Sequence, residues 1–133
     1  MSHKTTSILL CLDLERGTRE LANFCADCAA RWRYPVHVIH AHSDSGRGMK
    51  EVEAELKTLV DETLGDVEVQ ALYLCKGLPE DSIIEYATEK IENPVIILGR
   101  RKRSIADRIY VGSTTSAVIS LSEFPVMVVP LDL

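Results

Sequence analysis

A run of basic residues between two glycines is the part of this sequence best suited to chemistry. Five of the 15 Lys and Arg residues fall within nine positions: Arg100, Arg101, Lys102, Arg103 and Arg108. The chain as a whole has a formal net charge of -5, so this local reversal of sign indicates a site for an anion. With Gly99 before the run and Gly112 after it, the segment is typical of a loop that holds phosphate groups.

The residues that follow the basic run add a second source of phosphate-binding groups. Gly112, Ser113, Thr114 and Thr115 stand at the expected start of a helix, where backbone N–H groups and hydroxyls can donate to phosphate oxygens. Ser and Thr are also ordinary helix caps, so this segment alone leaves both interpretations open. The arginines that precede it favour phosphate binding.

The cysteines and serines give little indication of catalysis. Cys25 and Cys28 have the spacing of a redox pair, but they fall in the middle of an expected helix, where core packing is the favoured interpretation. Ser113 has no His and Asp partners at the spacing of a hydrolase nucleophile. We therefore expect a protein that is not an enzyme.

Three histidines fall on one expected strand, with His40 and His42 on one face and His37 on the other. A metal site is conceivable there. A hydrogen-bonded strand end is the favoured interpretation, because no carboxylate partner accompanies the pair.

Size and composition limit the class of protein. The 133 residues, 46% of them hydrophobic, are enough for a single domain spanning residues 1–133. The sequence contains no apolar run long enough to cross a membrane and no secretory signal at its start, which favours a cytoplasmic protein without membrane contact. The negative net charge argues against nucleic-acid binding.

Apolar runs of strand length alternate with segments of helical periodicity. Strands are predicted at residues 7–12, 35–42, 67–75, 94–98 and 125–129, with helices between them. The first helix, residues 16–33, is expected to bury one stripe formed by Leu21, Phe24, Cys25, Cys28 and Trp32. This alternation predicts an α/β fold: a single open, mostly parallel five-stranded sheet, Rossmann-like with strand order 3-2-1-4-5, and helices on both faces.

In such a sheet a ligand binds beyond the carboxyl ends of the strands, where the strand order reverses. Asp13 ends the first strand, Ala41 and His42 end the second, and Gly99 follows the fourth. We expect these segments to converge and to offer a carboxylate, main-chain groups and cations to one ligand.

From residues 8–13 to residues 124–130 the chain resembles the universal stress protein family. The nucleotide-binding members of that family carry Gly, two residues, Gly, nine residues, and then Gly followed by Ser or Thr. Here Gly99, Gly112 and Ser113 keep that spacing, while Lys102 stands at the second glycine. The resemblance implies ATP as ligand, with or without Mg²⁺. It implies phosphate and ribose contacts at Gly99, Arg101, Lys102, Gly112, Ser113, Thr114 and Thr115, and ribose and adenine contacts at Asp13 and Ala41.

Two departures from the family pattern bear on the ligand. A side chain in the left-handed conformation that the second glycine permits costs about 1–2 kcal/mol, whereas one charge-assisted hydrogen bond from Lys102 contributes about 1.5–3 kcal/mol. We therefore expect Lys102 to change selectivity among nucleotides. Leu14 and Glu15 stand where many relatives place a small Gly-Ser turn, and we expect them to narrow or reshape the crevice.

The expected function is stress-linked nucleotide binding that alters a surface for an unknown protein partner. Universal stress proteins commonly dimerise through the last strand, so the resemblance also implies a homodimer paired through Val126, Met127, Val128 and Val129. The alternative is a ligand-free, homodimeric interaction module in which the basic run docks on an acidic protein surface.

Overall fold

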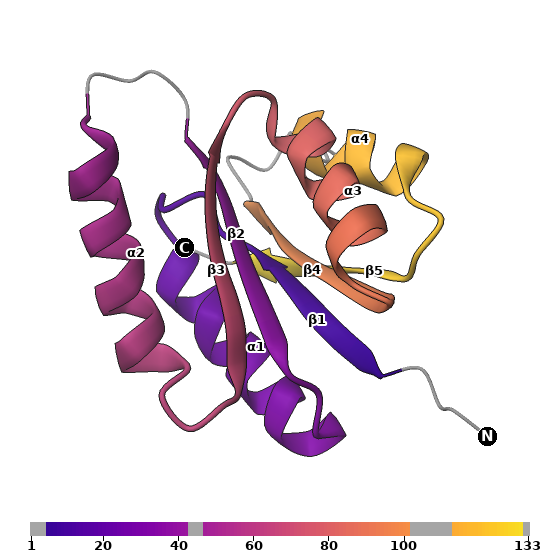
Figure 1. Ribbon diagram of the computed structural model, residues 1–133, viewed down its shortest axis with the longest axis horizontal. Coiled ribbons are helices and arrows are strands. Elements are labelled where there is room, and N and C mark those ends of the chain that lie inside the picture. The colour runs from indigo at the N-terminus through magenta and orange to yellow at the C-terminus, as the bar shows by residue number, and fades with distance from the viewer. Residues whose placement is uncertain (1–4, 43–46, 102–112, 132–133) are drawn as a thin grey trace.

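Five parallel strands form an open sheet in the order β3-β2-β1-β4-β5 (Figure 1). The computed structural model describes residues 5–42, 47–101 and 113–131. The strands are β1 (Thr6–Cys11), β2 (Val36–His42), β3 (Val69–Lys76), β4 (Asn93–Arg101) and β5 (Val126–Leu131). The helices are α1 (Thr18–Trp32), α2 (Met49–Thr63), α3 (Pro79–Lys90) and α4 (Ser113–Leu121). The predicted fold class and strand order are confirmed.

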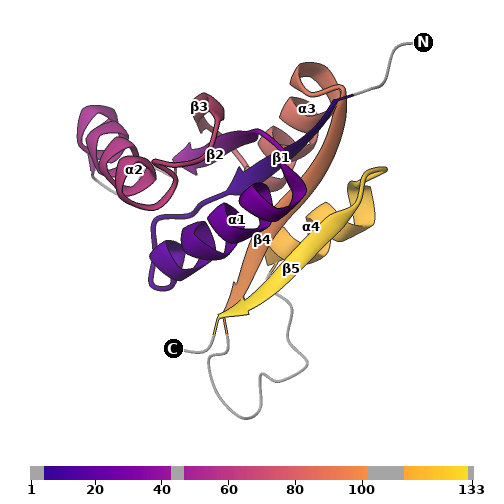
Figure 2. The ribbon, with the colours of Figure 1, turned by 90° about the horizontal axis from the view of Figure 1, so that it is seen from below.

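Helices cover both faces of the sheet, and the core is therefore divided into two layers (Figures 1 and 2). Leu21 of α1 and Leu56 of α2 pack with Leu10 of β1 on one face. Ile83 of α3 and Val118 of α4 pack on the other. The near-continuous apolar character of β1 follows from this arrangement, because a parallel strand covered on both faces favours apolar residues at successive positions.

The buried stripe of α1 is narrower than predicted. Leu21, Cys25 and Cys28 are buried as expected, but Phe24 is 39% exposed and Trp32 is 38% exposed. Phe24 falls about 100° around the helix from Cys25. Trp32 is the last residue of α1 and lies against the ring of Tyr34, with 5.7 Å between the ring centroids. Including these two aromatic residues in the buried stripe was therefore wrong.

The four cysteines are free thiols, with Cys25 and Cys28 buried and Cys11 and Cys75 half-buried. Burial raises the pKa of Cys25 to about 12, and the neighbouring Cys28 adds to the effect. A thiol of that pKa is protonated near neutrality, which agrees with a packing role for this pair.

Strand β4 extends further than the predicted 94–98. It runs to Arg101 because β5 also continues to Leu131, and the two strands remain paired at Gly99 with Val129 and at Arg101 with Leu131. The expectation that a phosphate-holding loop begins at Gly99 was therefore wrong, since Arg100 and Arg101 are strand residues. Lys102, Arg103, Arg108 and Gly112 lie outside the described residues.

Among the helices of the described ranges, none is long and apolar enough to cross a membrane.

Candidate functional site

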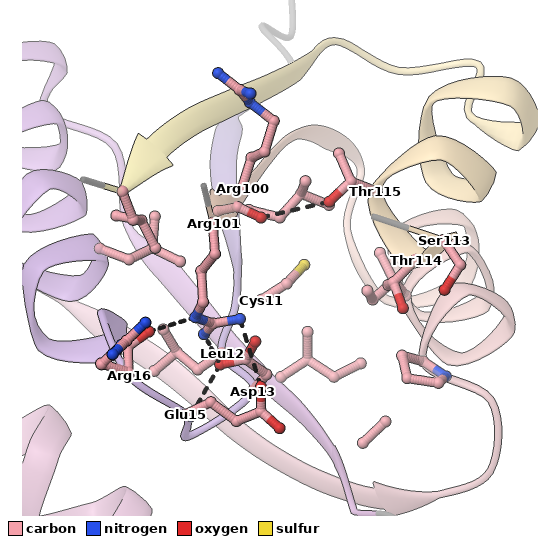
Figure 3. Close-up of a pocket in the computed structure, with 18 residues that line it drawn as sticks. Cys11, Leu12, Asp13, Glu15, Arg16, Arg100, Arg101, Ser113, Thr114 and Thr115 are labelled. Carbon is pink, nitrogen blue, oxygen red and sulfur yellow. Dashed lines mark hydrogen bonds and ion pairs between the residues drawn. The ribbon is translucent and has the colours of Figure 1, made fainter. Parts of the chain in front are cut away.

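A cavity of about 380 Å³ lies where β1, β2 and β4 reach their carboxyl ends (Figure 3). The described residues predicted for the site all line it: Asp13, Ala41, Gly99, Arg101, Ser113, Thr114 and Thr115. They come together because the carboxyl ends of parallel strands meet at one edge of the sheet. The other two predicted site residues, Lys102 and Gly112, fall outside the described ranges.

Asp13 organises the loop between β1 and α1. Its Oδ1 accepts hydrogen bonds from the backbone N–H of Glu15 at 3.0 Å, the hydroxyl of Thr18 at 3.1 Å and Nη2 of Arg101 at 2.6 Å. Burial by itself would raise the pKa of Asp13, but these hydrogen bonds and the charge of Arg101 outweigh it and hold the pKa below its ordinary value. Asp13 is therefore a carboxylate held in one position in the cavity lining.

Arg101 reaches from β4 across to the same loop (Figure 3). Besides the bond to Asp13, its Nη1 lies 3.5 Å from Oε2 of Glu15, and its Nε donates to the carbonyl of Arg16. Arg100, its neighbour on the strand, points the opposite way in Figure 3, as the two-residue period of a strand requires. Both arginines line the cavity, but their side chains leave β4 in opposite directions.

The first turn of α4 lies across the cavity from this network (Figure 3). Ser113 and Thr114 present hydroxyls there, while Thr115 is buried with its Oγ1 3.4 Å from the carbonyl of Gly99. This turn, which is described throughout, carries no acidic residue. Within this turn, no carboxylate complements the positive end of the α4 dipole.

Gly99 fits closely against two leucine side chains. A Cβ on Gly99 would lie 2.7 Å from Cδ1 of Leu131 and 3.3 Å from Cδ2 of Leu21. The close fit of α1 and β5 against β4 therefore explains a glycine here without any ligand.

Apolar side chains form the remaining wall of the cavity. Cys11, Ile39 and Ala41 come from the strands, and Pro79 and Ile83 come from α3. Burial raises the pKa of the Cys11 thiol far above its ordinary value, with a further contribution from Cys25. Cys11 is therefore suited to contact an apolar ring and unsuited to nucleophilic chemistry.

A model of the universal stress protein family matches residues 4–130. The chain belongs to that family. A comparison with curated proteins finds no match.

Solved structures of universal stress proteins share this fold. One, in complex with cAMP, is 19% identical with a TM-score of 0.72, over 98% of this chain and 99% of the other. A universal stress protein of Archaeoglobus fulgidus in complex with dAMP is 23% identical with a TM-score of 0.64, over 95% and 98%. A family member from Arabidopsis thaliana with AMP bound is 12% identical with a TM-score of 0.61, over 95% and 91%. At these identities the likeness establishes the fold.

Some lining residues of this universal stress protein were not predicted as site residues. Glu15 and Arg16 were missed as partners of Arg101, although the Asp-Leu-Glu sequence at 13–15 is typical of a turn in which Asp accepts from the N–H two residues on. Ile83 and Leu131 also line the cavity. Nothing local distinguishes them from other core residues, because their place depends on how α3 and β5 pack.

The histidines of this universal stress protein occupy the faces predicted for them. His40 Nδ1 lies 2.7 Å from the carbonyl of Leu12, and His42 Nε2 lies 3.0 Å from that of Arg47. His37 instead contacts Tyr86 of α3, with 2.9 Å between Nδ1 and the hydroxyl. Within the described ranges, no three His, Cys, Asp or Glu side chains are grouped so as to hold a metal ion.

Proposed function

We propose that this universal stress protein binds an adenine nucleotide in the cavity at the carboxyl ends of β1, β2 and β4. ATP is the ligand we propose, with or without Mg²⁺, in a stress-linked cytoplasmic role that depends on binding and not on catalysis. The ligands of related structures support the nucleotide class, since cAMP, dAMP and AMP are bound by the three universal stress proteins compared above.

The observation that carries this proposal is the asymmetry of the cavity. The side at α4 offers the hydroxyls of Ser113 and Thr114 and a helix N-terminus without acidic residues in its first turn. The first turn of α3, by contrast, contains Glu80 and Asp81, which complement its own dipole. A phosphate group is therefore favoured at α4, where N–H groups and hydroxyls can donate to it.

Other parts of the lining suit a nucleoside. Ile39, Ala41 and Ile83 offer apolar contact to a base, and Asp13, just after β1, offers a carboxylate. The three hydrogen bonds that Asp13 accepts all reach Oδ1, so Oδ2 is the oxygen proposed to accept from a ribose hydroxyl or to serve as an oxygen ligand of Mg²⁺. The cavity volume of about 380 Å³ falls in the range of small-molecule sites.

Thermal unfolding with and without ATP, ADP, AMP and cyclic nucleotides tests the proposal. A ligand at 100 times its dissociation constant stabilises the folded state by about 2.7 kcal/mol, which shifts the transition upward. Absorbance at 260 nm after denaturation detects nucleotide carried through purification. Absence of any shift, from protein free of nucleotide, would contradict the proposal, and release of ADP from ATP at a sustained rate would contradict the assignment as a binder.

The double variant Ser113→Ala/Thr114→Val locates the phosphate end. We expect affinity for AMP to fall about tenfold or more, since a hydrogen bond to a charged group contributes about 1.5–3 kcal/mol. Ser116→Ala is the matched control, because Ser116 is an exposed residue of the same helix and does not line the cavity. Equal affinities of the double variant and the control would place the phosphate elsewhere.

We further propose a homodimer formed by antiparallel pairing of β5. Strand β5 is an edge strand, and Val126, Met127, Val128 and Val129 are all half-buried. Apolar edge residues of this kind favour pairing with a second strand.

A ligand-free interaction module is the second candidate. It is favoured by one observation: Arg101, a cation expected to meet phosphate, already contacts the carboxylates of Asp13 and Glu15. Purified protein that releases no nucleotide and shows no thermal shift, but still forms a dimer, would support this candidate.

A further inference from the structure

We propose that Arg101 is a positioning residue that braces the β1–α1 loop against β4 and so fixes Asp13 for the nucleoside half of the ligand. This rests on the proposed function. It differs from the expectation that Arg101 contacts phosphate, and affinities for ligands with different numbers of phosphates distinguish the two roles.

Within the described residues, the acceptors around Arg101 all belong to one short loop. Nη2 donates to Asp13, Nη1 faces Glu15, and Nε donates to the backbone carbonyl of Arg16. The planar fork of the guanidinium is thus used on three sides by residues 13–16, and the side chain is only 25% exposed. The N–H of Nε and one N–H of Nη2 are thereby engaged in hydrogen bonds within this loop, and Nη1 is directed at the Glu15 carboxylate.

The loop that Arg101 contacts has a conformation that needs external support. Leu14 has a φ of 60° and Gly17 a φ of 94°, so two positive φ angles fall between β1 and α1. The left-handed backbone conformation is unfavourable for leucine. It persists where contacts with the surrounding structure hold the backbone in place. The hydrogen bonds from Arg101 to both ends of the 13–16 segment supply such a constraint from a strand more than 80 residues away in the sequence.

The balance of charge around Arg101 also favours its role in holding the β1–α1 loop. Two carboxylates, Asp13 and Glu15, face the single guanidinium of Arg101. If Arg101 moved to a phosphate, both carboxylates would be left without this cation and beside a polyanion, which is an unfavourable juxtaposition. The phosphate is met more favourably at α4, where the first turn carries no acidic residue.

The two roles predict different dependence on the number of phosphates. We would measure the affinities of adenosine, AMP and ATP for the full chain and for Arg101→Gln by calorimetry. A brace predicts the same fold loss for all three ligands, about tenfold, the size of one lost charged hydrogen bond. A phosphate contact predicts little loss for adenosine and a loss that grows from AMP to ATP, which would overturn the proposal. Arg31→Gln is the control for removing one positive charge at an exposed position of α1 far from the cavity lining.

A second measurement needs no ligand. Hydrogen exchange of the segment 13–18 should become faster in Arg101→Gln while exchange in β1 stays slow, because the loop loosens without global unfolding. Arg101→Lys keeps the charge but replaces the planar fork with a compact ammonium group that does not reproduce its geometry, so it should give an intermediate rate. Unchanged exchange in both variants would overturn the brace. If the unmodified protein binds none of the three ligands, the proposed function fails while exchange still decides the role of Arg101.

Discussion

Gly99 of β4 and Leu131 of β5 lie so close together that a Cβ on Gly99 would stand 2.7 Å from Cδ1 of Leu131. Both residues also line the cavity, so a change at this contact alters the packing of the sheet and the shape of the site together.

Gly99→Ala is expected to destabilise the protein by about 1–3 kcal/mol, the usual cost of overpacking a core. Urea unfolding measures the change. In the double variant Gly99→Ala/Leu131→Ala the new methyl group occupies space vacated by leucine, so the double variant should lose less than the two single variants added together. If the stability losses of the two single variants simply add in the double variant, the contact between Gly99 and Leu131 is not the cause of the destabilisation.

Asp13→Asn should lower stability near neutral pH by about 1 kcal/mol or less, because the ion pair with Arg101 is partly exposed and screened. The pKa of Asp13 is held low in the folded state, so its contribution is present above the ordinary aspartate pKa and is lost as pH falls through the folded value. Free energies of unfolding for the two proteins should therefore converge in acid. A difference that is independent of pH would show that the charge of Asp13 is not responsible.

His37 is expected to make stability fall as pH decreases below about 6.5, the ordinary histidine pKa. Burial lowers the pKa of His37, an effect that the hydrogen bond to Gln70 only partly opposes. The unfolded chain therefore binds a proton more readily than the folded one, and stability rises with pH through this range. His37→Gln should remove this component, as measured by urea unfolding at pH 7.5 and 5.5. Identical pH dependence of both proteins would refute the assignment.

Val128→Pro should convert the proposed dimer into a monomer. The N–H of Ile96 donates to the carbonyl of Pro125 at 2.9 Å, so the odd-numbered residues of β5 direct their backbone groups to β4 and Val128 directs its own outward. Proline at 128 removes an outward donor without removing a ladder bond. Light scattering at micromolar concentration gives the mass, with Val128→Ala as the control that keeps the N–H. A monomeric unmodified chain would rule out the dimer.

The sequence was sufficient to predict the order of the elements and the convergence of the described site residues on one cavity. Periodicity locates α1 and β1, and the parallel topology then brings Asp13, Ala41 and Ser113 to one edge of the sheet. These predictions succeeded because each depends on a local pattern or on a general rule of chain topology.

The predictions that failed depend on long-range pairing. Gly99, Arg100 and Arg101 have the composition of a loop, and only the ladder with β5 makes them strand. The partners of Arg101 lie in a segment that no local pattern connects to it. The burial of Trp32 was wrongly predicted because helical periodicity identifies only which face of α1 is buried. It does not show how far along the helix the sheet beneath it extends.

The order of the strands divides the cavity between regions of different local stability. β1, which leads into Asp13, is the central strand, and Ile8, Leu9 and Leu10 are fully buried, whereas the far side of the cavity is formed by α4 next to the edge strand β5. Edge elements open at lower free energy than central ones. Where β5 is not covered by a second chain, a local opening of α4 and β5 would release one end of a bound molecule while β1 and β2 keep hold of the other, so departure would proceed in two steps, from the rim of the sheet inward.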